Sequence, residues 1–299
     1  MPQPPLSWPI ALLYGSLRLA GRCPLRLVHA LGGGFGWLSW LWRGRARRIA
    51  ERNLSLVLTQ ESAETRHRLA RASLIETGKA IAEIAAIWGN DPQTALGLIR
   101  AVHGREHFDA ALAAGRGLIV AAPHLGCWEL LNYWLAAQTP LAILYRAPRH
   151  AALEPLLLRA RGALPVEQVR AEGAGVRTLY KRLAAAGVVG ILPDQQPRQG
   201  EGVSAPFFGV PAPTMVLLPR LAERTGAAVL FSFVERLPRG AGYHLHFLPA
   251  PPDLVDPDVA RACAALNGGV EACVRLAFAQ YQWSYKRWPM STPLPDTAS

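Results

Sequence analysis

The segment AAPHLGCWELL (121–131) contains a histidine and a glutamate, His124 and Glu129, whose types and spacing suit acid–base chemistry. A carboxylate that accepts one imidazole N–H fixes the tautomer of the ring and leaves the other nitrogen free to take a proton. Such a histidine can act as a general base toward a hydroxyl, which acyl transfer to an alcohol requires. The carboxylate would also stabilise the imidazolium that forms as the hydroxyl attacks.

The spacing of this pair allows more than one interpretation. Within one continuous helix, five residues would rotate the two side chains about 140° apart. The turn that Leu125–Gly126 can supply is therefore needed for them to meet. A structural pair that ties a loop to a helix explains the spacing equally well. A zinc site is the poorer interpretation, because no second HxxxE or CxxC element supplies further ligands, and we predict no metal site.

The elements that must position this pair form an α/β pattern after about residue 100. Short apolar runs alternate with helical segments near 106–114, 128–137, 151–162, 174–186, 214–225 and 259–281. Runs without polar alternation indicate strands buried on both faces, and hence a mixed, mostly parallel central sheet flanked by helices. The predicted strands are 117–122, 141–145, 188–192, 227–234 and 243–248. Upstream, 45–58 and 62–88 are predicted helices.

The predicted strands place three polar residues at one edge of the sheet. Ligands of open α/β sheets bind outside the carboxyl ends of the strands. His124 follows the first predicted strand, Arg146 follows the second and Asp194 follows the third. We therefore expect these side chains to share one rim.

Composition and charge restrict the class of partner. The chain has 299 residues, is 51% hydrophobic and carries a formal net charge of +11. Such a charge suits an anionic partner, namely a phospholipid surface, an acidic carrier protein or nucleic acid. The four cysteines show neither CxxC pairing nor metal-ligand spacing, which indicates reduced thiols on the cytoplasmic side.

The N-terminal residues favour a membrane over nucleic acid. Residues 6–42 are almost all apolar, and three tryptophans at 37, 40 and 42 precede a cluster of arginines. Aromatic residues beside a basic cluster are typical of a membrane anchor. The run 27–42 is somewhat short for the about 20 residues of a spanning helix, so a spanning helix, a helix in the interface and a buried core helix all stay open. The GGGFG stretch at 32–36 is not a nucleotide loop, because no strand precedes it.

Six segments carry recognisable motifs, namely RRIAERNL (47–54), HLGCWE (124–129), Tyr145-Arg146, the RxRG element 159–162, LPDQQPRQGEGVSAPFFGVPAPT (192–214) and YQWSYKRW (281–288). In this order they resemble the motifs of the bacterial lipid A biosynthesis acyltransferases, which belong to the wider HxxxxD/E acyltransferases. The resemblance covers nearly the whole chain, and HLGxWE together with PDQ…FFG is far more specific than HxxxxE alone. Cys127 departs from the pattern, since many relatives have Asn there.

The resemblance implies a reaction and its participants. His124 would be the general base and Glu129 its orienting carboxylate. The donor would be an acyl-acyl carrier protein, the acceptor a hydroxyl of a lipid A precursor at the cytoplasmic face of the inner membrane, and no metal or organic cofactor would be needed. Phosphate or oxyanion contacts are expected of guanidinium groups. The candidates are Arg146, Arg159 and Arg161, and Asp194 either orients one of them or is a turn residue.

Alternatives remain for the acceptor and for the function. The same chemistry could act on a lysophospholipid, an aminolipid or another glycolipid, and a non-catalytic lipid-binding membrane protein is the rival of a different class. For 281–288, a role at the membrane interface is favoured over nucleic-acid binding. The expected organisation is an anchor at 1–44, an acyltransferase domain at 45–288 and a disordered tail at 289–299.

Overall fold

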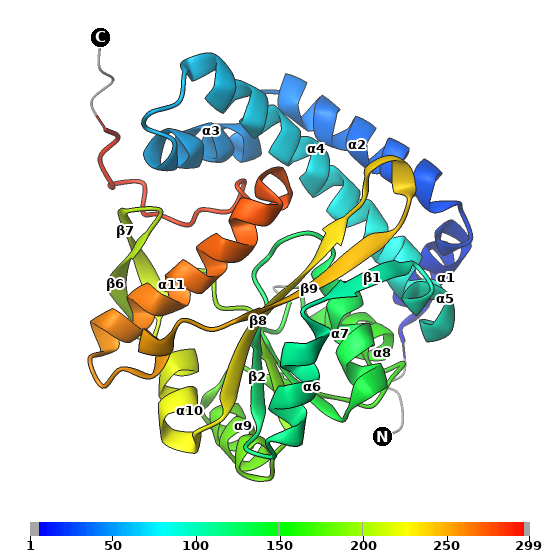
Figure 1. The fold of residues 1–299 in the computed structure, drawn as a ribbon. Helices are drawn as coiled ribbons and strands as arrows, with labels where there is room; N and C mark the ends of the chain where they lie inside the picture. The colour runs from blue at the N-terminus through cyan, green and yellow to red at the C-terminus, as the bar shows by residue number, and fades with distance from the viewer. Residues whose placement is uncertain (1–5, 149, 199, 296–299) are drawn as a thin grey trace.

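A seven-stranded sheet crosses the molecule in the computed structural model, which describes residues 6–148, 150–198 and 200–295 (Figure 1). Its strand order is β1-β9-β8-β2-β5-β3-β4, and every neighbouring pair is parallel except β8 and β9. The predicted mixed, mostly parallel sheet is thus confirmed. The strands are β1 (Ile99–His103), β2 (Leu118–Ala121), β3 (Leu141–Tyr145), β4 (Val166–Arg170), β5 (Val188–Ile191), β8 (Ala228–Arg236) and β9 (Tyr243–Pro249).

The five predicted strands correspond to β2, β3, β5, β8 and β9, and the sequence missed the others. All residues of β2 and β5 are buried, which explains their unbroken apolar runs. The edge strands β1 (IRAVH) and β4 (VEQVR) are partly exposed and carry polar residues. A separate two-stranded hairpin, β6 (Gly202–Phe207) and β7 (Val210–Met215), contains three prolines.

Helices cover both faces of the sheet. One face packs against α9, α10 and α11, and the other against α6 and α7. The predicted helices are present, but α10 begins after 214 because β7 occupies that position, and α11 ends before 281. The helices are α1 (Trp8–Gly21), α2 (Leu25–Leu41), α3 (Arg45–Val57), α4 (Ala63–Trp88), α5 (Pro92–Leu96), α6 (Arg105–Ala113), α7 (Trp128–Gln138), α8 (Glu154–Arg161), α9 (Gly173–Ala184), α10 (Leu217–Thr225) and α11 (Val259–Leu276), with short 3-10 turns at Ala151–Leu153, Pro238–Gly240, Pro252–Val255 and Phe278–Gln280.

The glycine-rich stretch of α2 is a helix-packing surface. A Cβ on Gly36 would lie 2.2 Å from the carbonyl oxygen of Leu74 in α4, and one on Gly32 would lie 2.6 Å from that of Gly78. A Cβ on Gly78 would in turn lie 2.1 Å from the carbonyl oxygen of Gly32. The absence of side chains lets the two helix backbones approach closely, so these glycines join α2 to α4.

A buried ionic network joins the N-terminal helices to the sheet. Glu83 of α4 is 1% exposed and accepts hydrogen bonds from two nitrogens of Arg236 at the end of β8. His29 of α2 lies 2.7 Å from the same carboxylate, and the hydroxyl of Tyr243 in β9 donates to it over 2.8 Å. Four elements therefore meet at one carboxylate.

The C-terminal aromatic segment lies in the core, so the favoured membrane-interface role for 281–288 is wrong. Trp283 and Trp288 are each 1% exposed, and Trp288 stacks on Phe207 of β6. Asn53 of α3 donates to the carbonyl oxygens of Trp283 and Tyr285 over 2.8 and 2.7 Å. Of the predicted tail, 296–299 lie outside the described residues, whereas the carbonyl oxygens of residues 289 and 290 accept hydrogen bonds from a guanidinium in α3.

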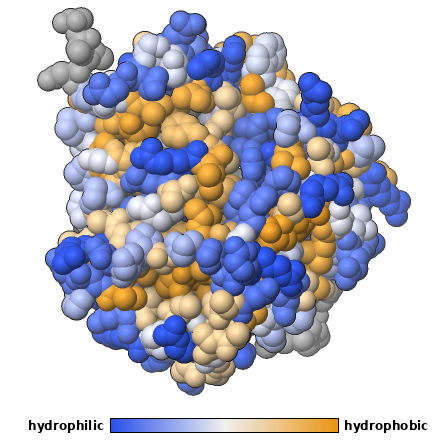
Figure 2. Space-filling view, viewed as in Figure 1, coloured by the Kyte–Doolittle hydropathy of each residue, from blue (hydrophilic) through white to orange (hydrophobic). Residues whose placement is uncertain are grey.

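Helices α1 and α2 keep much of their apolar surface exposed. No helix among the described residues is both long and apolar enough to cross a membrane. On α2, the face opposite the glycines presents Leu31, Phe35 and Leu38, each more than half exposed, and Trp42 directly after the helix is 88% exposed. Hydrophobic surface bordered by hydrophilic side chains is also visible on the face of the molecule in Figure 2. The high apolar content of the chain is thus not confined to its core.

Candidate active site

The loop after β2 is held rigidly against β8. The backbone N–H of Cys127 donates to the carbonyl oxygen of Val234 over 2.9 Å. Gly126 has a φ of +61°, and a Cβ there would lie 1.9 Å from that same carbonyl oxygen. Only glycine fits this conformation and this contact. The Leu125–Gly126 turn, expected from the sequence, therefore fixes the position of His124.

His124 forms two hydrogen bonds with Asp194. Its ring Nδ1 lies 2.8 Å from Asp194 Oδ1, and its backbone N–H donates to Oδ2 over 2.9 Å. Asp194 follows β5, the parallel neighbour of β2, and Ala121 pairs with Ile191 at the ends of the two strands. The shared rim predicted for His124 and Asp194 is thus present, but Asp194 holds the histidine rather than an arginine.

The hydrogen bonds of His124 define its tautomer. Burial would raise the pKa of Asp194, but the charge of His124 and the hydrogen bonds from it outweigh burial and lower that pKa below its ordinary value. An ionised carboxylate accepts only, so Nδ1 carries the proton. The Nε2 atom then accepts from the side-chain amide of Gln195, 3.1 Å away. In its neutral form, His124 therefore presents an unprotonated Nε2, which a general base requires.

The predicted direct pairing of His124 with Glu129 is wrong. Glu129 is buried in the first turn of α7, and both its oxygens accept hydrogen bonds from Arg161 at the end of α8, one of them over 3.0 Å. The indole N–H of Trp88 in α4 donates to the same carboxylate over 3.3 Å. Burial raises the pKa of Glu129, but Arg161 and the indole donors lower it overall, so the carboxylate is ionised. The helix that begins at Trp128 aims Glu129 toward α4 and α8 instead of toward His124.

A cavity of about 800 Å³ opens beside His124. Its wall contains the apolar side chains Ile143, Leu157 and Val176 from three elements. The ring of Trp128, whose centroid lies 5.4 Å from that of His124, also faces the cavity. Such a site combines an apolar volume with a basic nitrogen, which suits an apolar chain that carries a reactive carbonyl.

Five arginines line this cavity, and the sequence predicted two of them. Arg146 and Arg161 were expected, and both are there, although Arg161 is engaged by Glu129. Arg159 is not among the lining residues; its guanidinium lies 5.5 Å from the ring centroid of Tyr14 in α1. The lining arginines that the sequence did not indicate are Arg198, Arg220 and Arg224.

The site residues that the sequence did not predict carry little sequence pattern that would place them near His124. Arg220 and Arg224 are spaced by four in α10, so they share one face of that helix, but nothing in the sequence orients this face toward His124. Gln195 lies in the PDQ segment that was recognised, yet its contact with the histidine requires the β2–β5 pairing.

Cys127 is buried, and burial raises the pKa of its thiol well above the ordinary value. It is therefore a protonated packing residue and no nucleophile. Within the described residues, three side chains that could together ligate a metal ion lie on β1 and β9, and none of them lines the cavity beside His124.

Comparisons with known proteins agree with the resemblance seen in the sequence motifs. The family model described as bacterial lipid A biosynthesis acyltransferase matches residues 3–289. The lipid A biosynthesis lauroyltransferase of Escherichia coli is 27% identical over 287 residues, 95% of this chain and 92% of that protein. The lipid A biosynthesis palmitoleoyltransferase of Escherichia coli is 25% identical over 285 residues, again 95% and 92%. A phosphatidylinositol mannoside acyltransferase of Mycobacterium tuberculosis is 31% identical over 221 residues, 72% and 68%. The chain belongs to the bacterial lipid A biosynthesis acyltransferase family.

Proposed function

We propose that this protein transfers a fatty acyl chain from an acyl carrier protein thioester to a hydroxyl of a lipid A precursor. The observation that carries the proposal is the His124–Asp194 pair, whose histidine lines a partly apolar cavity, in a chain of this family. The matches to the lauroyl and palmitoleoyl transferases named above each cover 95% of this chain and 92% of the relative.

In the proposed reaction, Nε2 of His124 takes the proton of the acceptor hydroxyl as its oxygen attacks the thioester carbonyl carbon. The imidazolium is stabilised by the ionised Asp194 at Nδ1. The tetrahedral intermediate then expels the carrier thiolate, which receives the proton back from Nε2. The ester forms, the thioester breaks and the histidine is regenerated.

Glu129 acts on this reaction through Arg161 in our proposal. The carboxylate occupies two nitrogens of the guanidinium and so fixes its direction, while the arginine also lines the cavity. A fixed positive charge there would stabilise the oxyanion of the intermediate or a phosphate of the acceptor. Glu129 thus remains a required residue, as a positioning residue rather than as the partner of His124.

The acceptor and donor are inferred from charge. Arg146, Arg198, Arg220 and Arg224 surround the apolar cavity, and no ion pair of theirs is found among the described residues. Unpaired guanidinium groups suit phosphates of a glycolipid. The net charge of +11 suits an acidic carrier protein.

A second acceptor class has one observation in its favour. The phosphatidylinositol mannoside acyltransferase is the most nearly identical of the three relatives over the residues it matches. A phosphorylated glycolipid other than lipid A would meet the same arginines. Transfer to a lysophospholipid or aminolipid follows the same chemistry.

We further propose that residues 1–44 attach the protein to the cytoplasmic face of the inner membrane by lying in the interface. The support is the exposed apolar face of α2, the exposed Trp42 and the arginines that follow directly at 43, 45 and 48. Apolar side chains beside basic ones are the combination by which helices bind anionic bilayers.

Mass spectrometry of lipid A from a strain that lacks this protein tests the proposal. We expect one acyl chain to be missing, and to be restored by the wild-type protein but not by His124→Ala produced at the same level. Intact lipid A, with another lipid one acyl chain short, would reassign the acceptor. Restoration by His124→Ala would remove the catalytic assignment.

A further inference from the structure

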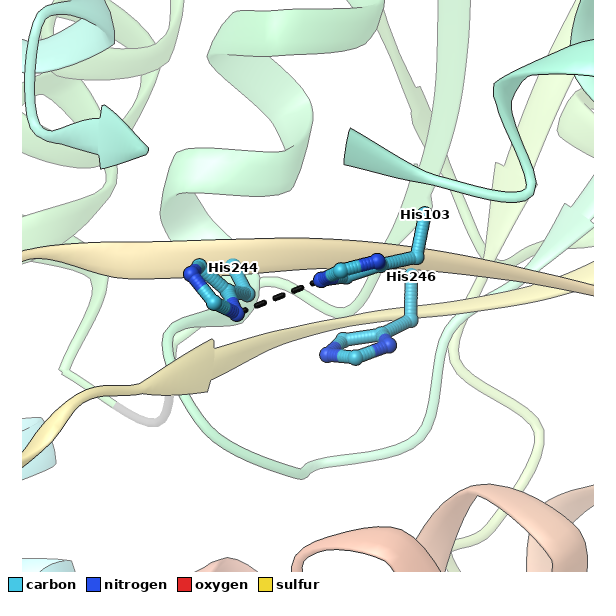
Figure 3. Close-up of side chains that lie close together, drawn as sticks. All are labelled: His103, His244 and His246. Atoms are coloured by element: carbon cyan, nitrogen blue, oxygen red, sulfur yellow. Dashed lines mark hydrogen bonds between the residues drawn. The ribbon is translucent and has the colours of Figure 1, made fainter. Parts of the chain in front are cut away.

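Three histidines meet on one face of the sheet, outside the acyl-transfer site. His103 is the last residue of β1, and His244 and His246 belong to the adjacent β9. In the register of this parallel pair, His103 lies opposite His246. Along β9, buried residues alternate with His244 and His246, so both histidines point to the same side (Figure 3).

The ring nitrogens of these histidines are close enough to share one ion. Each ring offers one nitrogen, and the three atoms lie within 4.8 Å of one another. His103 Nε2 lies 3.2 Å from His244 Nδ1. In a tetrahedral zinc site, ligand nitrogens about 2.0–2.1 Å from the metal lie about 3.3 Å apart. One pair therefore already has the spacing of two ligands on the same ion.

The surroundings of His246 resemble those of a metal-ligating histidine whose ring is oriented by a neighbouring carboxylate. Glu235 of β8 lies opposite His244 in the register, and its Oε2 lies 2.9 Å from His246 Nε2. A carboxylate beside a ligand histidine orients the ring and offsets the charge of a cation. On the inner side, the ring of Phe233 stacks on His246 at 4.6 Å and 4°.

Entry to the cluster is open from the solvent. His103 is exposed and His244 half-buried, whereas His246 is held between Phe233 and Glu235. His103 is the last residue of β1, and its ring stacks 4.7 Å from that of His246. The cluster thus has one ligand held by neighbouring side chains and one ligand exposed to solvent.

We propose that His103, His244 and His246 bind one divalent transition metal of borderline softness, such as zinc, with Glu235 as the supporting carboxylate. Imidazole nitrogens are the ligands that such metals prefer. The bound ion would join the edge strand β1 to β9. None of the four residues lines the cavity beside His124, so this site is separate from the proposed acyl transfer.

Zinc titration of the full-length protein tests this site. The chain would be purified without a histidine tag, stripped with a chelator and titrated with zinc against a chromophoric competitor. We expect one equivalent to bind and to raise Tm, since a ligand that binds the folded state stabilises it. Cobalt in place of zinc should give the d–d absorption of a tetrahedral nitrogen site.

Variants identify the ligands. His103→Ala, at an exposed position, should weaken zinc binding at least about tenfold and make the rise in Tm smaller at the same zinc concentration, and Glu235→Gln should weaken binding by on the order of tenfold. His107→Ala, an exposed histidine on α6, is the matched control and should bind as the wild type does. His244→Asn serves as the second ligand variant should His103→Ala fail to fold. The proposal is overturned if the wild type takes up no stoichiometric zinc, or if the ligand variants bind it as tightly as His107→Ala.

Discussion

The hydrogen bonds of His124 decide which carboxylate supports the proposed base. Asp194 accepts from both the backbone and the ring of His124, whereas both oxygens of Glu129 are taken by Arg161. Two buried carboxylates thus support two different groups at one site, the imidazole of His124 and the guanidinium of Arg161. The pKa of each carboxylate is lowered, because the interactions with its partner outweigh burial.

Substitution of Asp194→Asn tests this division at the level of single residues. An amide can donate to Nδ1 and so favour the tautomer that has its proton on Nε2, where the hydroxyl proton must go. We expect kcat to fall by on the order of 10²–10⁴-fold with little change in KM. Steady-state acyl-transfer kinetics with carrier-bound donor provide the measurement.

Matched variants show whether the effect is specific. Asp109→Asn, at an exposed position on α6, should leave the kinetics unchanged. Glu129→Gln should lower the rate while the hydrogen bond between His124 and Asp194 stays, which NMR of the imidazole nitrogens can report. An Asp194→Asn enzyme with wild-type kcat would show that this carboxylate does not orient the base.

The sequence indicated His124 as the proposed base but did not indicate the carboxylate that contacts it. Glu129 is five residues from His124, and such a short separation suggests contact. Asp194 is 70 residues away, and its contact depends on β2 and β5 being neighbours, which no local pattern reveals. The rim residues could be predicted because they follow buried strands; their pairing could not, because it depends on strand order.

At the scale of elements, the packing of α2 on α4 depends on glycine. We expect Gly36→Ala to lower the free energy of unfolding by about 1–3 kcal/mol, because its Cβ would lie 2.2 Å from a backbone oxygen of α4 that cannot move alone. Denaturant or thermal unfolding in detergent measures the change.

Gly34→Ala is the matched control, two residues away in the same helix. A Cβ there meets nothing within 4 Å, so alanine should leave stability unchanged or raise it by up to about 1 kcal/mol through helix propensity. Equal destabilisation by both substitutions would contradict the assignment of the requirement for glycine at Gly36 to its contact with α4.

The network around Glu83 makes stability depend on pH. Burial raises the pKa of this carboxyl, but Arg236 and His29 lower it from 4.5 to about 2 in the folded protein. The charged carboxylate therefore contributes stability above pH 4.5, and this contribution is lost as the pH falls toward 2. Glu83→Gln should cost about 3–5 kcal/mol at neutral pH, because it leaves Arg236 buried without its main partner.

The measurement is Tm as a function of pH for wild type, Glu83→Gln and Glu64→Gln, an exposed glutamate on the same helix. The Glu83 variant should start from a lower Tm and decline less steeply in acid than the other two proteins. Parallel Tm curves for all three would contradict the assignment of this acid dependence to Glu83.

Helices and strands could be predicted from the sequence where the burial of their residues follows a uniform or regular pattern. The fully buried β2 and β5 give unbroken apolar runs, and α4 gives a long helical period. The edge strand β4 carries Glu167, Gln168 and Arg170 and looks like a loop in sequence. The buried Trp283 and Trp288 resemble interfacial aromatics, because residue type alone does not tell a core from a bilayer surface.

For the whole molecule, the exposed apolar face of α2 predicts attachment to anionic bilayers. Leu31→Ser, Phe35→Ser and Leu38→Ser combined should weaken binding to vesicles that contain anionic phospholipid by at least tenfold, because each loses about 1.5–3 kcal/mol of transfer free energy at full burial. Co-sedimentation with vesicles measures the loss, and Tm should stay unchanged.

Val255→Ser, Leu276→Ser and Met290→Ser remove a comparable number of exposed apolar side chains outside α1 and α2. This control should bind vesicles as the wild type does. Equal loss in both triple variants would indicate general surface hydrophobicity instead of a defined membrane face.

Reconstituted acyl transfer by His124→Ala tests the central claim most directly. Wild type, His124→Ala and the control His107→Ala would each receive acyl carrier protein loaded with a fatty acid and a purified lipid A precursor, and the acylated product would be quantified by mass spectrometry. We predict product from the wild type and from His107→Ala, and a rate lower by on the order of 10²–10⁴-fold from a folded His124→Ala protein. Product formation by His124→Ala at the wild-type rate would contradict the account.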